Sequence, residues 1–116
     1  MILVVDDHPI TLQVVARVLR SRGHDARTAP SGHAALHILS QISPNLVILD
    51  LSMPDMDGLT VLRTVRCDRR HLNTSVIVFT GSDERVQEAL ESGAQAVFVK
   101  GTTSWEHFLE HIETAA

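Results

Sequence analysis

The sequence predicts a doubly wound (βα)5 domain of the α/β class, in which a five-stranded parallel sheet is covered by helices on both faces. Two observations support this fold class. Five segments of strand length, four of them apolar runs, alternate with segments whose apolar residues recur at the spacing of an α-helix. In addition, the runs at 2–5 and 46–49 contain no polar residue, which is typical of strands buried on both faces of a sheet.

The first predicted strand, Ile2–Val5, ends at two acidic residues, Asp6 and Asp7. A helix should follow, because Pro9 suits a first helical turn and Gly23 suits a C-terminal cap. The residues expected to form its apolar face are Ile10, Val14, Val15, Val18 and Leu19.

Residues 24–29 are short and more polar, which fits a strand at the edge of the sheet. Ser31 can cap a second helix, and Pro44 ends it. The expected inward residues of that helix are Ala35, Ile38, Leu39 and Ile42. The third strand, Leu46–Leu49, stops at Asp50, so a second buried strand ends at a carboxylate.

The third predicted helix begins after Gly58, and its apolar positions are Leu59, Val61, Leu62 and Val65. A polar connection over 67–74 leads to the strand Ser75–Phe79, which ends at the hydroxyl of Thr80. The fourth helix ends at Gly93. Its expected inward residues are Val86, Ala89 and Leu90.

The last predicted strand, Ala96–Val99, ends at the cation of Lys100. Thr103 and Glu106 have the spacing of a capping box, which predicts the start of a final helix. Its apolar face is expected to contain Trp105, Phe108, Leu109 and Ile112.

The residues that follow parallel strands meet at one edge of the sheet, where open parallel sheets bind ligands. Here they are Asp6, Asp7, Asp50, Thr80 and Lys100. Three neighbouring carboxylates repel one another unless a cation compensates them. All the expected ligand atoms are oxygens, which favours a hard ion, Mg²⁺ or Mn²⁺. Asp50 could then attack phosphorus as a nucleophile, because the ion, Lys100 and Thr80 can share the charge of the phosphoryl oxygens.

Composition narrows the class of protein further. The 116 residues, 44% of them hydrophobic, are expected to form a single domain over 1–116. A net charge of −4 argues against direct nucleic-acid binding. The single cysteine, Cys67, and the absence of a signal-like or membrane-spanning apolar run predict a cytoplasmic protein with no membrane segment.

Four short motifs stand at the ends of four predicted strands. They are Asp-Asp at 6–7, Leu-Asp-Leu-Ser-Met-Pro-Asp-Met-Asp-Gly at 49–58, Phe-Thr-Gly at 79–81 and Phe-Val-Lys at 98–100. In this order they resemble the receiver domain of response regulators in two-component signalling, and the resemblance covers nearly the whole chain. It implies a sheet with the flavodoxin-like strand order 2-1-3-4-5.

The resemblance also implies roles for the acidic residues. Asp50 would be the phosphoacceptor, which takes a phosphoryl group from a histidine kinase or a histidine phosphotransfer domain. Asp7 would bind Mg²⁺ directly and Asp6 largely through water, and the backbone carbonyl of Ser52 would be a further metal ligand. Such a domain is a signalling phosphoacceptor and not a turnover enzyme, although it assists its own phosphorylation and could assist its dephosphorylation.

Family members switch when a threonine and a lysine bind the new phosphoryl group, here Thr80 and Lys100. The face made by the fourth helix, the fifth strand and the fifth helix then changes and can bind an output domain or a second copy. Family members usually have a tyrosine or phenylalanine three residues before the lysine, and its ring moves when the threonine moves. This sequence has Val97 at that position, and a valine cannot swing between rotamers as a ring does. Phe98 should face the opposite side of the strand and pack under a helix.

Other functions fit the residues less well. A haloacid-dehalogenase-type phosphatase needs a second aspartate where Ser52 stands, and a flavin site would place a phosphate beside Asp6 and Asp7, which would repel it. A dinucleotide site would need a glycine fingerprint that is absent. The alternative that remains is a receiver-like interaction module that acts independently of phosphorylation, for which Val97 leaves room.

Several further acids and histidines have plainer interpretations. Asp55 and Asp57 are expected to form the turn before Gly58 and not to bind metal. The histidine pairs His33/His37 and His107/His111 have the i, i+4 spacing of helical metal ligands. Neither pair has a third ligand nearby in the sequence, so both are expected to be solvated helix faces.

Overall fold

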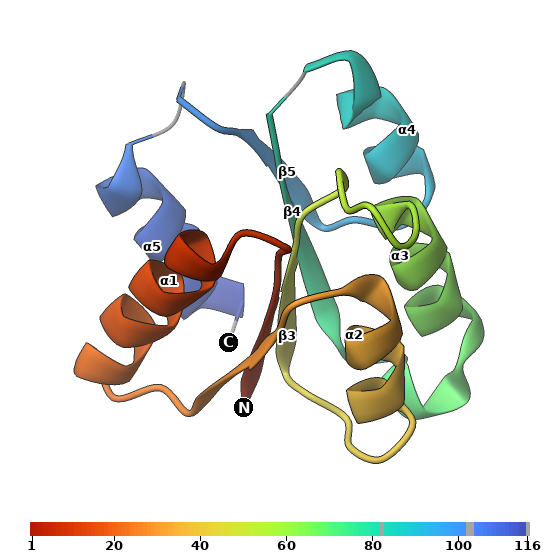
Figure 1. Cartoon of the computed structure of the whole chain (residues 1–116), viewed down its shortest axis with the longest axis horizontal. Helices are drawn as coiled ribbons and strands as arrows, with labels where there is room; N and C mark the ends of the chain where they lie inside the picture. Colours follow the sequence, from red (N-terminus) through yellow and green to blue (C-terminus); the bar gives the residue numbers. More distant parts are fainter. Residues whose placement is uncertain (82, 102–103, 116) are drawn as a thin grey trace.

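The computed structural model describes residues 1–81, 83–101 and 104–115, apart from the side chain of residue 105. Within these residues, five strands alternate with five helices (Figure 1). The strands are β1 (Ile2–Val5), β2 (Ala26–Ala29), β3 (Leu46–Leu49), β4 (Ser75–Thr80) and β5 (Ala96–Val99). The helices are α1 (Pro9–Ser21), α2 (Gly32–Leu39), α3 (Gly58–Cys67), α4 (Val86–Glu91) and α5 (Trp105–Ala115), with short 3₁₀ turns at Arg69–His71 and Asp83–Arg85.

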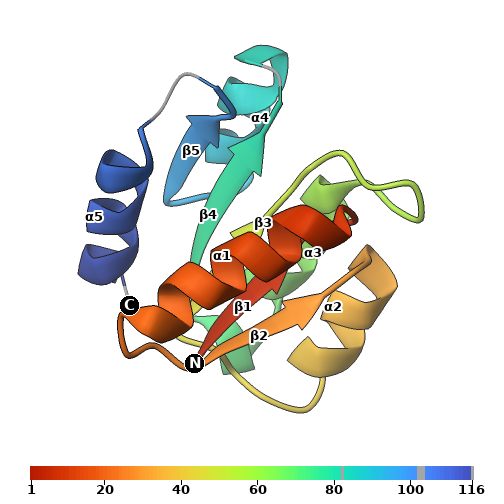
Figure 2. The same cartoon turned by 60° about the vertical axis from the view of Figure 1, so that its left-hand side comes forward.

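The strands form one sheet in the order β2-β1-β3-β4-β5, and every neighbouring pair is parallel. The predicted flavodoxin-like order is therefore confirmed. Helices α1 and α5 cover one face of the sheet, and α2, α3 and α4 cover the other (Figures 1 and 2). None of the described helices is long and apolar enough to cross a lipid bilayer.

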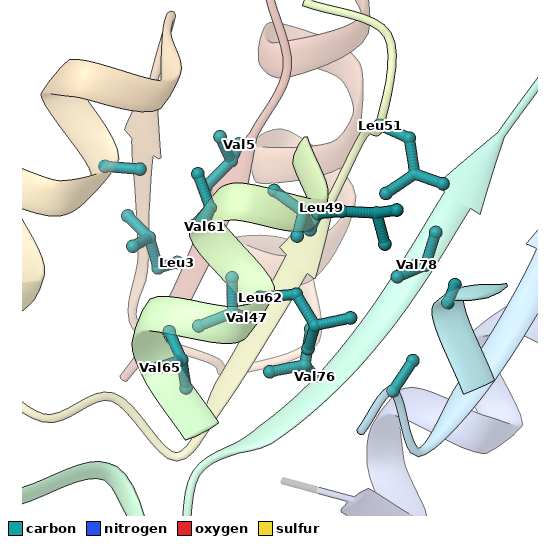
Figure 3. Packing of buried hydrophobic residues seen from close by; sticks show 14 of the residues in the cluster. Leu3, Val5, Val47, Leu49, Leu51, Val61, Leu62, Val65, Val76 and Val78 are labelled. Atoms are coloured by element: carbon teal, nitrogen blue, oxygen red, sulfur yellow. The ribbon is translucent and has the colours of Figure 1, made fainter. Parts of the chain in front are cut away.

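Two hydrophobic cores lie on the two faces of the sheet, because successive residues of each strand point to opposite sides. On the side of α2, α3 and α4, Val61, Leu62 and Val65 of α3 pack against β1, β3 and β4 (Figure 3). On the other side, α1 and α5 pack against the alternate strand residues, among them Leu46 and Ile48. Burial of each such side chain contributes about 2 kcal/mol, so both faces of the central strands are anchored.

The helix starts agree in part with the predicted caps. Ser31 caps α2, because its hydroxyl accepts a hydrogen bond from the backbone N–H of Ala34. Asp57 caps α3 by accepting from the N–H of Leu59. At the start of α5 the N–H of His107 donates to the hydroxyl of Ser104. The predicted capping residue Thr103 and the side chain of Trp105 lie outside the described part of the chain.

The predicted apolar face of α1 was partly wrong. The buried residues are Leu12, Val15, Ala16 and Leu19, whereas Ile10 is 76% exposed and Val14 is 45% exposed. Both sets have helical spacing and share Val15 and Leu19, so the sequence contains two overlapping stripes. Packing against β1 selects the stripe that contains the smaller Ala16, which lets the helix approach the sheet.

Other differences lie at the ends of helices. Helix α2 ends at Leu39, so Ile42, which was expected inside it, lies in the following loop and is half-buried. Leu90 was expected to face inward but is 42% exposed, because α4 is short and packs mainly through Ala89. The connection predicted to be polar contains the buried His71, whose Nε2 lies 2.8 Å from the carbonyl oxygen of Leu39.

Candidate functional site: an acidic cluster at the strand ends

The five predicted site residues lie at the carboxyl ends of β1, β3, β4 and β5, which are consecutive strands of the sheet. Asp6 and Asp7 follow β1, Asp50 follows β3, Thr80 is the last residue of β4, and Lys100 follows β5. Backbone hydrogen bonds extend the ladders into these residues, from the N–H of Asp50 to the carbonyl of Val5 and from the N–H of Lys100 to the carbonyl of Thr80. The sheet itself therefore positions the side chains.

Lys100 joins two of the carboxylates. Its Nζ lies 3.4 Å from Oδ2 of Asp6 and 3.7 Å from Oδ1 of Asp50. Both aspartates are buried, and Asp50 is only 3% exposed. Thr80 is buried beside them at the end of β4. The structure thus brings the acids, the hydroxyl and the ammonium group to one edge of the sheet, as the sequence predicted.

The three carboxylates of Asp6, Asp7 and Asp50, called the acidic cluster below, are not fully compensated by Lys100. Burial raises the pKa of Asp50, and the neighbouring charge of Asp6 adds to this, while Lys100 opposes it. Among the described residues, Oδ2 of Asp50 and Oδ1 of Asp7 are buried but accept no hydrogen bond. Unpaired buried carboxylate oxygens that converge in this way suit a hard divalent cation, so the residues present fit Mg²⁺.

The backbone at Ser52 also lies next to the acidic cluster. The N–H of Ser52 points to Oδ1 of Asp50 over 3.4 Å, and Ser52 forms an isolated bridge with Asp57 across the loop. The proposed role of its carbonyl group as a metal ligand stays a prediction.

Gly58 allows this loop to close. A Cβ atom at Gly58 would lie 2.4 Å from the carbonyl oxygen of Asp50 and 2.6 Å from Cα of Leu51. Those neighbours are backbone atoms that cannot move aside without shifting Asp50. The start of α3 therefore approaches the end of β3 closely only because residue 58 has no side chain.

One residue of the site, His8, was not identified by the sequence analysis. Nδ1 of His8 lies 2.9 Å from Oδ1 of Asp6 and 3.3 Å from Oδ1 of Asp7. The hydrogen bond with Asp6 raises the pKa of His8, and the charges of Asp7 and Asp6 act in the same direction. The signal in the sequence was its position directly after two acids at a strand end.

Asp55 and Asp57 have structural roles, as expected of residues in a turn. The carboxylate of Asp55 accepts hydrogen bonds from the N–H groups of Gly32 and His33 at the start of α2, and these bonds lower the pKa of Asp55 to about 2. Asp57 pairs with Arg85 at 2.6 Å in addition to capping α3. The two loops beside the acidic cluster are thereby tied to neighbouring helices.

Neither predicted histidine pair belongs to a group of three or more potential metal ligands among the described residues. His33 binds Asp55 at 2.6 Å and is mostly exposed. His107 and His111 are exposed on α5, where their rings pack edge-on against Phe98. Within the described ranges, the single group of three or more potential metal ligands is Asp6, Asp7, His8 and Asp50, which each offer an atom within 4.8 Å of the others.

Fold and site together define a flavodoxin-like domain with an acidic edge whose residues fit a divalent cation. The model of the response regulator receiver domain matches residues 2–113, and the chain belongs to this family. The prediction of the family from the four motifs is confirmed, and receiver domains bind Mg²⁺ as a family.

Curated relatives place the same domain in larger proteins. The chain is 37% identical over 103 residues to the sensor histidine kinase RcsC of Salmonella typhimurium. This alignment covers 89% of this chain but only 11% of RcsC. The chain is also 36% identical over 118 aligned positions to the transcriptional regulatory protein KdpE of Mycobacterium tuberculosis. This alignment covers 99% of this chain and 50% of KdpE. The chain therefore spans half or less of the length of these relatives.

Solved structures show the same fold over the whole chain. The chemotaxis response regulator CheY4 of Vibrio cholerae superposes with a TM-score of 0.89 at 26% identity, covering 99% of this chain and 97% of CheY4. The response regulator TrrA of Thermotoga maritima, solved in complex with Mg²⁺ and BeF, superposes with a TM-score of 0.87 at 28% identity, covering 99% of this chain and 97% of TrrA.

Proposed function

We propose that residues 1–116 form one phosphoacceptor domain that takes a phosphoryl group onto Asp50 from a histidine kinase or a histidine phosphotransfer protein. The observation that supports this most directly is the state of Asp50. Its carboxylate is buried, one of its oxygens accepts no hydrogen bond among the described residues, and the ammonium group of Lys100 lies beside its other oxygen. This leaves one oxygen free to attack.

The transfer would break the P–N bond of a phosphohistidine and form a P–O bond to a carboxylate oxygen of Asp50. The departing imidazole takes the electron pair of the broken bond. Lys100 would hold charge on the phosphoryl oxygens, and Thr80 would donate its hydroxyl to one of them once the group is attached. Thr80 ends β4, which pairs with β3, and Lys100 follows β5, which pairs with β4, so both lie on the same side of Asp50 along the sheet edge.

Asp6, Asp7, Asp50 and the carbonyl group of Ser52 would hold Mg²⁺, and Mn²⁺ could replace it. When bound, such an ion supplies positive charge to the phosphoryl oxygens in the transition state. Asp7 has a partly exposed side chain with one unpaired oxygen, which suits direct binding of the ion. Asp6 already accepts from Lys100 and from the N–H of His8, which suits an indirect contact through water.

The relatives support a histidine kinase as the partner, since a sensor histidine kinase and response regulators have matching segments. The surface beside Asp50 is also suited to a protein donor. Ile10 and Val14, exposed on α1, line a groove together with Phe79 and Lys100. A donor that seats on these apolar side chains would bring its phosphohistidine next to the lysine.

The output would be a change in the face made by α4, β5 and α5, through which an output domain or a second copy would bind. Val97 is half-buried against the core on the side of α2, α3 and α4, and Phe98 is buried on the opposite side against Phe108. A ring that swings out of the sheet is therefore missing at position 97. A conformational change that begins at Thr80 would therefore have to be transmitted to the output face by a shift of α4.

The experiment is intact-protein mass spectrometry after incubation with acetyl phosphate, with and without Mg²⁺. Wild type should gain one phosphoryl group only when Mg²⁺ is present, and Asp50→Asn should gain none. Asp55→Asn is the matched control, because Asp55 caps α2 and should leave the reaction intact. A folded wild type that binds Mg²⁺ but gains no phosphoryl group would refute the proposal and favour a module that acts by docking alone.

A further inference from the structure

The ring of His8 lies among the potential ligand atoms of the acidic cluster, all within 4.8 Å of one another. Two ligands at right angles in an octahedron are about 3.0 Å apart when each bond is about 2.1 Å long. Nδ1 of His8 is 2.9 Å from Oδ1 of Asp6 and 3.3 Å from Oδ1 of Asp7. The spacing between Nδ1 and Oδ1 of Asp7, the proposed direct ligand, is therefore close to that of neighbouring corners of one octahedron.

The nitrogen-bearing side chains of Lys100 and His8 approach different carboxylate oxygens of the site. Lys100 approaches Oδ2 of Asp6 and Oδ1 of Asp50, whereas His8 approaches Oδ1 of Asp6 and Oδ1 of Asp7. An ion on the side of His8 would thus leave the contact of Lys100 with Asp6 in place. Asp7 and Asp50 each have a buried oxygen that accepts no hydrogen bond among the described residues, and both belong to the same group of potential ligands.

The backbone of His8 is anchored while its ring is free to adjust. Its N–H donates to Oδ1 of Asp6 at 2.9 Å, at the residue that precedes α1. The side chain is 63% exposed, so the ring can shift its position by small rotations about its side-chain bonds without tight packing against it. The ring can therefore follow an ion bound by the aspartates.

We propose that His8 supplies an imidazole nitrogen to the divalent ion held by the acidic cluster, and that this ligand raises the affinity of the site for transition ions such as Ni²⁺ more than its affinity for Mg²⁺. This inference rests on the metal site of the proposed function. Imidazole binds transition ions well, whereas Mg²⁺ strongly favours oxygen. A receiver with this ligand would sense which ion fills its site, because the occupant helps to set the rate of phosphoryl transfer.

The test compares wild type with His8→Gln by calorimetric titration with Ni²⁺ alone and with Mg²⁺ alone, above the pH range in which histidine is protonated. We expect His8→Gln to lose about tenfold in Ni²⁺ affinity with little change in Mg²⁺ affinity. His33→Gln is the matched control, since His33 also pairs with an aspartate but lies outside the acidic cluster. It should change neither affinity.

A second readout detects the ligand directly. Mn²⁺-loaded wild type should show ¹⁴N hyperfine coupling from a bound imidazole in electron spin-echo experiments, and Mn²⁺-loaded His8→Gln should not. Absence of this coupling in wild type, or a loss of Ni²⁺ affinity no larger than that of Mg²⁺, would overturn the proposal. A rise in affinity for both ions in His8→Gln would also overturn it, because His8 would then compete with the ion.

Failure of this inference is distinguishable from failure of the proposed function. If His8 is not a ligand, wild type and His8→Gln should still gain a phosphoryl group on Asp50 with Mg²⁺. If the acidic cluster binds no ion at all, wild type will show no heat with either Ni²⁺ or Mg²⁺, which contradicts both proposals at the metal site.

Discussion

Replacing Asp50 with asparagine should stabilise the ion-free protein at neutral pH. Asp50 is 3% exposed, its burial raises its pKa, and its Oδ2 accepts no hydrogen bond among the described residues. An ionised carboxylate in this position loses hydration and is repelled by Asp6, and Lys100 at 3.7 Å compensates only part of this cost. Asparagine has nearly the same shape without the charge.

The size of the effect is that of a typical substitution at a buried site, which changes stability by about 0.5–3 kcal/mol. Because Lys100 offsets part of the cost of the buried charge, we expect a gain toward the lower end of this range, on the order of 1 kcal/mol. With about 2.1 cal/mol/K of unfolding entropy per residue, a chain of 116 residues should gain roughly 4 °C in its melting temperature.

The pH dependence has a definite sign. The native carboxyl group of Asp50 keeps its proton to a higher pH than the unfolded one, whose pKa is near 3.8. The unfolded state therefore loses its proton first, and wild type loses stability as pH rises from about that value through the raised native pKa. The advantage of Asp50→Asn should be full at neutral pH and should disappear in acid, where both states are protonated.

The assay is thermal unfolding followed by circular dichroism at several pH values, first with a chelator and then with Mg²⁺. Addition of Mg²⁺ should narrow the gap, because the ion binds native wild type more tightly than the variant. Asp55→Asn is the opposite control: hydrogen bonds lower the pKa of Asp55, so loss of its charge should destabilise the protein. If Asp50→Asn melts at or below the wild-type temperature at neutral pH without divalent ions, the electrostatic reasoning is refuted.

Three further predictions concern the loop, the lysine and the docking surface. Gly58→Ala should lower stability by about 3 kcal/mol, as measured by urea unfolding, because its Cβ would meet the backbone of Asp50. Gly81→Ala, with no atom within 4 Å of the added Cβ, should cost far less, and equal losses would contradict the close approach at Gly58. Lys100→Met should slow phosphorylation by acetyl phosphate about 100-fold in the mass assay, and an unchanged rate would exclude Lys100 from the reaction. Ile10→Asp should slow transfer from a phosphorylated histidine phosphotransfer protein at least tenfold while leaving acetyl phosphate unaffected, whereas equal effects on both donors would argue against docking at Ile10.

The sequence was sufficient to predict how the site residues come together. Uninterrupted apolar runs at 2–5 and 46–49 could be stable only inside a parallel sheet, and the charged residues directly after them had to lie at its carboxyl edge. The meeting of Asp6, Asp50, Thr80 and Lys100 follows from strand order and direction alone. Local chemistry likewise identified the cap at Ser31, because a hydroxyl that bonds the third N–H of a helix acts within a few residues.

Tertiary structure alone decided the features that depend on distances between remote segments. Periodicity gives the angular spacing of residues on α1 but not the phase of the helix against the sheet, so Ile10 was assigned to the core and is exposed. Asp55 accepts a hydrogen bond from the first residue of a helix that begins 23 residues earlier in the chain. Residue 58 must be glycine because a Cβ atom there would collide with the backbone of Asp50. No local sequence pattern encodes either contact. The same holds for His8: its ring reaches two carboxylates because the turn after β1 folds back on them, and the direction of a side chain at a strand end is set by the turn.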